Sequence, residues 1–303
     1  MNAHVAVLMG GWSAEREVSL TSGRACALAL RGAGYRVTEI DVDETLTHRL
    51  SGLKPDVVFN ALHGRWGEDG CVQGLLELLR LPYTHSGVRA SAIAMHKPSS
   101  LEMFRAHGIP CAESCLTTPA AVNAKDPMDR PYVVKPPAEG STVGVRIVRL
   151  GDNNPPVDAG WNFGDEVLAE RYIPGRELTV AVMDGGALGV TDIRTEDGFY
   201  DYNAKYVEGG SCHIVPAPID EGIYTQAMDF AERAHRALGC KGVSRSDFRY
   251  DDTKGEPGRL FMLEINTQPG MTPTSLVPEL AAYRDIDFSA LVRWMVEDAG
   301  CAR

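Results

Sequence analysis

Residues 259–270 read RLFMLEINTQPG, a stretch that combines the pattern of a buried strand with two polar side chains. Side chains in a strand alternate between its two faces, so Glu264 and Asn266 are predicted to share one face. Leu260 and Met262 are expected on that same face. A buried carboxylate is costly unless a cation, a metal ion or several hydrogen-bond donors are paired with it. The stretch therefore predicts a functional strand whose partner lies elsewhere in the chain.

The segment GVSRSDFRY, residues 242–250, predicts the partner strand. In a symmetric hairpin, Asp247 would lie opposite Glu264. Arg245 would then lie opposite Asn266. Two carboxylates and an amide would converge beside an arginine, and hard oxygen ligands of this kind suit Mg²⁺. The hairpin alone leaves an alternative open, namely surface ion pairs on an exposed strand face.

Length and composition indicate a soluble globular protein of several domains. The chain has 303 residues, of which 44% are hydrophobic and 23% are charged, which fits about two or three domains of ordinary composition. The sequence shows neither a signal-peptide pattern nor an apolar run near the ~20 residues of a membrane span, so no membrane partner is expected. Seven cysteines without a CxxC pair favour reduced thiols and a cytoplasmic location. The formal charge of −11 argues against nucleic-acid binding.

The first ninety residues alternate between strand and helix patterns. Strands are predicted at 5–9, 35–42 and 56–62, and helices at 17–30 and 72–80. This alternation predicts a parallel sheet covered by helices, with ligands bound beyond the carboxyl ends of the strands. The loops at those ends, GGWSAE and HGRWGEDG, lack the GxGxxG fingerprint of a dinucleotide site. A nicotinamide-dependent dehydrogenase is therefore rejected as the leading hypothesis.

A different pattern begins at residue 97. A helix is predicted over KPSSLEMFRAHGIP, followed by strands at 131–137, 143–148 and 167–173, a hairpin over 177–193 that turns at Asp184-Gly185-Gly186, and a helix over 223–238 that ends at Gly239. The hairpin and helix predictions follow from turn residues and apolar periodicity. The long irregular segment 194–218 is typical of a functional loop.

Five separated segments together resemble the D-alanine:D-alanine ligase family of the ATP-grasp superfamily. They are LMGGWSAEREVSL at 8–20, HGRWGEDG at 63–70, KPPAEGSTVGV at 135–145, RSDF at 245–248 and EIN at 264–266. The resemblance runs through nearly all of the chain in the right order. It implies an α/β protein of ATP-grasp architecture. The implied domains are an N-terminal parallel α/β domain at 1–93, a small central α+β domain at 94–175 and a C-terminal antiparallel α+β domain at 176–303.

The resemblance implies that ATP drives the ligation of two D-alanines to D-alanyl-D-alanine through a D-alanyl-phosphate intermediate, for peptidoglycan precursors. Two Mg²⁺ ions, or Mn²⁺, would bridge the ATP phosphates and bind Asp247, Glu264 and Asn266. A homodimer is also implied. Two alternatives are kept: a ligase that makes D-alanyl-D-lactate or D-alanyl-D-serine, and a non-catalytic nucleotide-binding relative. The complete set of predicted ligands argues against the second.

Nucleotide contacts are implied on the same basis. Lys97 and Lys135 would contact ATP phosphates, although from the sequence alone each lysine could be a solvated surface charge. The glycine-rich segment 139–144 would cover the nucleotide with its backbone amides. Further contacts with ATP would come from Glu170, Arg171, Tyr172, Ile173, Glu177, Phe199 and Lys205. Two departures from the family pattern, His96 and the proline-rich segment 151–166, leave the local nucleotide packing open.

The resemblance also implies the residues that bind the amino acids. Glu15, helped by His63, would hold the ammonium group of the first D-alanine, although a carboxylate near a helix start is favourable in any case. Glu15, Ser141 and Tyr206 would form a hydrogen-bonded network that closes the site. Arg245 and the Gly270 N–H would stabilise the oxyanion of the tetrahedral intermediate. Ser275 would bind the carboxylate of the second D-alanine.

Overall fold

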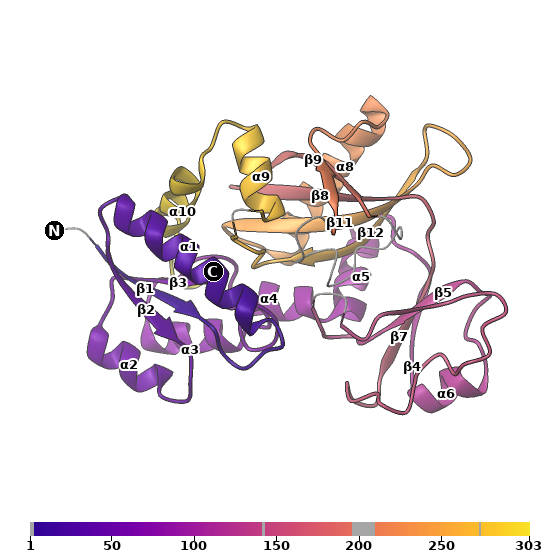
Figure 1. Cartoon of the computed structure of the whole chain (residues 1–303), viewed down its shortest axis with the longest axis horizontal. Coiled ribbons are helices and arrows are strands. Elements are labelled where there is room, and N and C mark those ends of the chain that lie inside the picture. The colour runs from indigo at the N-terminus through magenta and orange to yellow at the C-terminus, as the bar shows by residue number, and fades with distance from the viewer. Residues whose placement is uncertain (1–2, 141–142, 196–209, 273) are drawn as a thin grey trace.

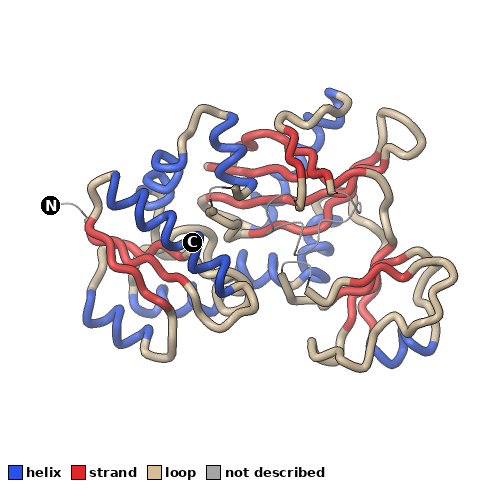
Figure 2. Tube along the Cα trace, in the orientation of Figure 1, coloured by secondary structure: helices blue, strands red, loops and turns tan. Residues whose placement is uncertain are grey.

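The computed structural model describes residues 3–140, 143–195, 210–272 and 274–303. These residues form three sheets with helices packed against them (Figure 1). Figure 2 shows the strands gathered in three separate groups, with the C-terminal sheet between the other two. Within the described ranges, no helix has both the length and the apolar character needed to cross a membrane.

The N-terminal sheet is parallel and has the strand order β2-β1-β3. Its strands are β1 (His4–Met9), β2 (Arg36–Asp41) and β3 (Val57–Asn60). Its helices are α1 (Arg16–Gly32), α2 (Leu46–Leu53) and α3 (Cys71–Leu79). β1 is entirely buried, because α1 covers one face of the sheet and α2 and α3 cover the other. The predicted parallel sheet is confirmed.

Two short helices, α4 (Val88–Met95) and α5 (Lys97–Ala106), lead to the central sheet. This sheet is antiparallel, with the order β4-β7-β5-β6. Its elements are β4 (Ser114–Thr117), α6 (Pro119–Ala124), β5 (Tyr132–Lys135), β6 (Arg146–Val148) and β7 (Val167–Arg171). A small core forms beneath it around Tyr132 and Val134.

The C-terminal sheet is antiparallel, with the order β10-β9-β8-β11-β12. Its strands are β8 (Arg176–Met183), β9 (Gly186–Arg194), β10 (Cys212–Ile214), β11 (Val243–Asp251) and β12 (Arg259–Asn266). Its helices are α8 (Glu221–Leu238), α9 (Leu276–Tyr283) and α10 (Phe288–Glu297). The predicted turn between β8 and β9 is confirmed, because Asp184 and Gly185 both have positive φ.

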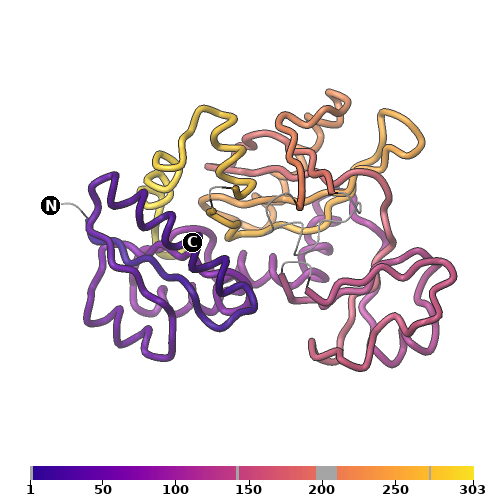
Figure 3. Tube along the Cα trace, in the orientation of Figure 1, coloured from indigo at the N-terminus to yellow at the C-terminus, as the bar shows by residue number. Residues whose placement is uncertain are grey.

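The last two helices connect the two ends of the chain in space. Leu291, Val292 and Met295 of α10 share a core with Val5 and Leu30 of the N-terminal unit. Figure 3 shows the yellow C-terminal segment beside the indigo N-terminal one. Neither α9 nor α10 was predicted from the sequence. The residues that follow β3 and those that follow β12 are thereby held close together.

One prediction about β12 is wrong. Asp247 lies opposite Glu264 as predicted, but the next residue, Phe248, lies opposite Met262. Leu263 is therefore an extra residue on its strand, which makes it a β-bulge. A bulge shifts the alternation of side chains by one position.

Because of this bulge, Glu264 and Asn266 do not share a face with Leu260 and Met262. The latter two are buried in the core that includes α8, and Ile265 belongs to that same core. Glu264 and Asn266 instead line a cavity on the other side of the strand. The polar pair is thus kept out of the hydrophobic core. A second correction concerns the segment predicted to be irregular, since residues 212–214 form β10 on the edge of the sheet.

Candidate active site

A cavity of about 470 Å³ lies beyond the ends of β1, β3 and β12. We call it the strand-end cavity. Its walls include many of the residues predicted for the amino-acid and metal sites: Glu15, His63, Lys97, Arg245, Glu264, Asn266, Gly270 and Ser275. They come from three parts of the chain that are distant in sequence, so the fold itself assembles the site.

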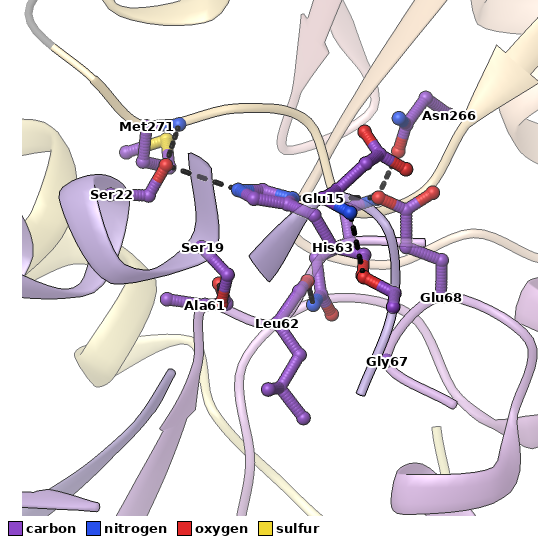
Figure 4. A network of polar contacts seen from close by, with 12 residues as sticks. Glu15, Ser19, Ser22, Ala61, Leu62, His63, Gly67, Glu68, Asn266 and Met271 are labelled. Atoms are coloured by element: carbon purple, nitrogen blue, oxygen red, sulfur yellow. Dashed lines mark hydrogen bonds and ion pairs between the residues drawn. The ribbon is translucent and has the colours of Figure 1, made fainter. Parts of the chain in front are cut away.

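Glu15 and His63 meet at the N-terminal side of this cavity (Figure 4). Both are almost fully buried. The His63 imidazole is fixed from both sides, because its Nε2 lies 3.0 Å from Ser22 Oγ and its Nδ1 lies 3.4 Å from a carboxylate oxygen of Glu68. Glu15 lies against the glycine-rich segment, since a Cβ added to Gly140 would be 2.9 Å from Glu15 Oε2. The Glu15 carboxylate can bind an ammonium group here, whereas both nitrogens of His63 already have protein partners, so the imidazole can only form part of the wall beside it.

Gly270 and Ser275 also line the strand-end cavity. A Cβ added to Gly270 would be 2.9 Å from Ser275 Oγ, so a side chain at position 270 would displace that hydroxyl. Ser275 Oγ accepts a hydrogen bond of 3.0 Å from the Thr272 N–H and lies 2.7 Å from Thr272 Oγ1. Ser275 also precedes α9, where the helix dipole favours a bound carboxylate.

The predicted hairpin register is confirmed at the functional residues. Asp247 is opposite Glu264 and Arg245 is opposite Asn266. Arg245 and Asp247 follow each other on one face of β11 and form a two-point ion pair, with Nε–Oδ1 at 2.9 Å and Nη2–Oδ2 at 2.8 Å. The Thr179 hydroxyl donates a further hydrogen bond of 2.6 Å to Asp247. Asp247 is therefore held in one orientation.

A second cavity, of about 110 Å³, separates the central sheet from the C-terminal sheet. We call it the lysine cavity. It adjoins the strand-end cavity, because Lys97, Glu139 and Glu264 line both. Its walls also include the residues predicted to contact ATP, namely Lys135, Glu170, Arg171, Tyr172, Ile173 and Glu177, together with Asp247. The two cavities would let a nucleotide and an amino acid meet.

The two lysines are buried and paired with carboxylates. Lys97 Nζ lies 3.1 Å from Glu264 Oε2 and donates a hydrogen bond of 2.6 Å to the Glu139 carbonyl. Lys135 Nζ lies 3.2 Å from Glu170 Oε1. The other oxygen of Glu170 is buried and has no hydrogen-bond partner among the described residues. Buried acceptors are normally satisfied, so this oxygen suits a donor group on a bound ligand.

The electrostatics of the wall between the cavities are set by burial. Desolvation raises the pKa of Glu139, and the positive charges of Arg65 and Lys97 partly oppose this shift. Glu177 is paired with Arg249 at 3.4 Å. Arg249 also donates to the carbonyl groups of Ile173 and Gly175, so it fixes the segment that leaves the central sheet.

The predicted metal ligands form a chemically suitable set. Asp247, Glu264 and Asn266 offer hard oxygen donors on neighbouring strands, which is the ligand type that Mg²⁺ prefers. Lys97 neutralises Glu264, and Arg245 neutralises Asp247. The Gln268 N–H donates a hydrogen bond of 2.7 Å to Asn266 Oδ1. Among the described residues no cluster of three or more His, Cys, Asp or Glu could hold a metal ion. A set of two carboxylates and one amide would need further oxygen ligands, such as those of a bound phosphate.

Four predicted site residues, Ser141, Phe199, Lys205 and Tyr206, lie outside the described residues. Their assignments stay predictions. All the other predicted site residues line one of the two cavities.

Several residues of the site were missed in the sequence. Glu68 belongs to the HGRWGEDG motif, and Arg249 alternates with Asp247 on β11, so both had a signal that could have been used. Glu139 lines both cavities and lies inside the glycine-rich motif. Thr179 had no such signal, because its contact with Asp247 depends on the pairing of β8 with β11.

Comparison with known proteins extends these findings. Residues 104–297 match the family described as D-ala D-ala ligase C-terminus, and residues 46–86 match D-ala D-ala ligase N-terminus. The chain is 62% identical to the D-alanine–D-alanine ligase of Parvibaculum lavamentivorans, over 99% of this chain and 98% of that protein. It is 57% identical to the D-alanine–D-alanine ligase of Methylocella silvestris, over the full length of both.

A solved structure is also similar. It is the D-alanine–D-alanine ligase from Bacillus anthracis complexed with ATP, with a TM-score of 0.79 and 30% identity over 98% of this chain and 97% of that one. The fold and the two adjoining cavities thus define an ATP-grasp protein. The chain belongs to the D-alanine–D-alanine ligase family.

Proposed function

We propose that this chain joins two molecules of D-alanine to give D-alanyl-D-alanine at the expense of ATP, as a step in peptidoglycan precursor synthesis. One observation carries the proposal: the strand-end cavity and the lysine cavity adjoin through Lys97, Glu139 and Glu264. Membership of the family and full-length similarity to proteins named D-alanine–D-alanine ligase support it.

In the first step, ATP occupies the lysine cavity. Lys97 and Lys135 contact its phosphates, the unsatisfied oxygen of Glu170 accepts from the adenine amino group, and Glu177 binds the ribose. Glu15 holds the ammonium group of one D-alanine, and His63, fixed between Ser22 and Glu68, helps to shape the site around it. The carboxylate of that D-alanine attacks the γ-phosphorus, the bond to the β-phosphate oxygen breaks, and D-alanyl-phosphate and ADP form. The protein contributes position and charge neutralisation.

In the second step, Ser275 binds the carboxylate of another D-alanine. Its amine, after loss of a proton, attacks the carbonyl carbon of D-alanyl-phosphate. Arg245 and the Gly270 N–H stabilise the oxyanion that develops, as oxyanion-hole donors do. The intermediate then collapses with loss of phosphate, so the products are the dipeptide, ADP and inorganic phosphate.

Asp247, Glu264 and Asn266 would hold Mg²⁺, with Mn²⁺ as a substitute. When bound, the metal ions supply positive charge to the phosphate oxygens. Arg245 and Lys97 orient the two carboxylates for this role. Ser141, Tyr206, Phe199 and Lys205 keep the roles that the family resemblance implies. We also propose a cytoplasmic homodimer with domains at 1–93, 94–175 and 176–303.

The alternatives are less well supported. Ligases that make D-alanyl-D-lactate or D-alanyl-D-serine would have a different acceptor, whereas the full-length relatives named above are all D-alanine–D-alanine ligases. A silent nucleotide-binding protein would not require Arg245 and Ser275 in the same cavity as Glu264 and Asn266, two of the predicted metal ligands.

The deciding experiment measures phosphate release from ATP and Mg²⁺ across a panel of D- and L-amino acids and D-lactate, with the product identified by mass. We expect release with D-alanine and a product with the mass of D-alanyl-D-alanine. A competition between D-alanine and D-lactate at neutral pH should give mainly the dipeptide. A product containing lactate would replace the proposal with the depsipeptide alternative.

A further inference from the structure

Three amide side chains form a buried cluster behind the strand-end cavity. Asn60, Gln73 and Gln268 are each no more than 1% exposed. Two of them belong to the N-terminal unit, whereas Gln268 follows β12 and is more than 200 positions away in sequence. Fully buried amides are expensive unless their hydrogen-bonding groups are satisfied, so the partners of this cluster indicate what it does.

Gln268 connects two parts of the site. Its side-chain oxygen accepts a hydrogen bond of 2.5 Å from Asn60 Nδ2, and its side-chain nitrogen donates to the carbonyl of Leu62. Its backbone N–H donates to Asn266 Oδ1 at 2.7 Å. The side chain thus contacts the N-terminal unit, while the main chain contacts a predicted metal ligand.

The Leu62 carbonyl belongs to the peptide bond that leads to His63, and Figure 4 shows Leu62, His63, Gly67 and Glu68 grouped below Glu15. The loop that carries His63 and Glu68 is held at its beginning and at its end. At the beginning, Asn60 Oδ1 accepts from the Leu62 N–H at 3.2 Å.

At the end of the loop, the Gly67 carbonyl accepts two hydrogen bonds, one of 3.1 Å from Asn60 Nδ2 and one of 2.7 Å from Gln73 Nε2. Of the three amides, Gln268 alone ties this loop to the segment that carries Asn266 and Gly270. The position of His63 relative to Gly270 therefore depends on this one side chain more than on the other two amides.

We infer that Gln268 is a positioning residue, which sets the distance between the His63 loop and the Gly270 loop and so the placement of D-alanine between them. This inference rests on the proposed function. It adds a residue that acts through the Leu62 carbonyl and Asn60, without contact to the substrate.

The first test replaces Gln268 by Met, which has a similar shape and no amide. The Leu62 carbonyl then loses its donor, and the His63 loop loses its direct hydrogen bonds to residue 268. The bridge in which Ser22 Oγ contacts both His63 Nε2 and the Met271 N–H remains. We expect KM for D-alanine to rise about tenfold, because both buried hydrogen bonds of the amide are lost. KM for ATP should change less than about twofold, because the backbone N–H to Asn266 remains in the variant.

The second test, Gln268→Asn, keeps an amide and shortens the side chain by one CH₂ group. The shorter side chain cannot reach both Asn60 Nδ2 and the Leu62 carbonyl, so KM for D-alanine should rise while KM for ATP changes less than about twofold. This milder change also protects the test if the Met variant folds poorly.

The matched control is Ser244→Ala, which removes a buried hydrogen bond of 2.7 Å to His235 Nδ1 away from the site. It should lower the unfolding temperature and leave both KM values unchanged. The inference is overturned if Gln268→Met and Gln268→Asn behave like this control, or if KM for ATP and for D-alanine rise together. If wild type makes no dipeptide, the proposed function fails first, and that result is distinct because it needs no variant.

Discussion

Each carboxylate of the proposed metal site is held by a cation of the protein. Lys97 lies 3.1 Å from Glu264, and Arg245 forms a two-point ion pair with Asp247. These cations offset part of the cost of burying negative charge. They also define a place where a divalent ion and a phosphate can enter with little change in net charge. The charge of Glu264 is therefore expected to matter for the reaction more than for the fold.

We predict that Glu264→Gln lowers kcat by on the order of 10²–10³-fold or more, since removal of one preorganised electrostatic group has this effect. The amide keeps the size of the side chain and can still accept from Lys97, so the unfolding temperature should change little. Phosphate release at saturating Mg²⁺ measures the first effect, and thermal unfolding measures the second.

Glu102→Gln is the control for this variant, because Glu102 is exposed on α5. It removes the same charge from the chain at a position outside both cavities. Near-normal phosphate release by Glu264→Gln at ordinary Mg²⁺ would contradict a role for this carboxylate in turnover.

A buried histidine makes stability depend on pH. Burial lowers the pKa of His235 to about 4, with help from Lys241 and Arg236. The unfolded chain has an ordinary pKa near 6.5 at this position. Between these values the unfolded state binds a proton that the folded state does not, so the free energy of unfolding falls as the pH drops from about 6.5 to 4, by up to about 1.4 kcal/mol per pH unit.

We predict that His235→Asn flattens this dependence. The Asn side chain can replace the imidazole nitrogen that contacts Ser244 Oγ at 2.7 Å, but it cannot take up a proton in this range. Urea unfolding at pH 7.5, 6, 5 and 4.5 measures the slope. His85, whose pKa burial lowers to about 3, remains in the variant and should keep part of the slope. If the unfolding free energy depends on pH equally in wild type and variant, His235 does not contribute to this dependence.

At the scale of elements, the pairing of β11 with β12 was predictable and the bulge was not. The register follows from two adjacent strands of similar length, a local relation that the sequence contains. The bulge at Leu263 depends on which side chains the core under α8 accepts, and that core includes α5 and β8 as well. Contacts of this range cannot be read from alternation alone.

The same limit applies to the rest of the site. The motifs gave the predicted ligands, because each lies within a short segment at a strand end. The amide cluster of Asn60, Gln73 and Gln268 gave no signal, since its members are polar residues whose burial depends on the contact between the N-terminal unit and the segment after β12. The strands and helices predicted from periodicity were found, whereas the helices α2, α4, α6, α9 and α10 and the short strands β4 and β10 were not predicted.

We predict that deletion of Leu263 destroys the site. Without the bulge, residues before and after it fall into one continuous alternation, and either Glu264 enters the core or Leu260 and Met262 leave it. Burial of an unpaired carboxylate or loss of two core side chains should cost several kcal/mol of unfolding free energy. Urea unfolding and phosphate release measure the two consequences.

Leu263→Ala is the control for the deletion. It keeps the extra residue and therefore the register, and Leu263 lines the lysine cavity instead of belonging to the core under α8. Its unfolding free energy should stay far closer to that of wild type. A deletion variant that turned over ATP normally would show that the bulge does not orient Glu264.

At the scale of the whole molecule, the lysine cavity lies between the central sheet and the C-terminal sheet. Lys135 and Glu170 belong to the central sheet, while Asp247 and Glu264 belong to the C-terminal sheet. A nucleotide in this cavity would contact both sheets. It should therefore stabilise the folded chain as a unit, by RT ln(1 + [L]/Kd), or about 2.7 kcal/mol at a hundred times Kd.

The last prediction uses this stabilisation to test the nucleotide site without turnover. Wild type with ATP and Mg²⁺, but without D-alanine, should unfold several degrees higher than without nucleotide. Loss of Lys135 alone would leave the charge of Glu170 buried and unpaired, at a cost of about 3–5 kcal/mol unrelated to ATP. The informative variant is therefore Lys135→Met with Glu170→Gln, which removes both charges. It should keep most of its stability and lose most of the shift caused by ATP, whereas Lys125→Met, at an exposed position, should keep the full shift. If the double variant is stabilised by ATP as much as wild type, the nucleotide binds elsewhere and the proposed roles of Lys135 and Glu170 are wrong.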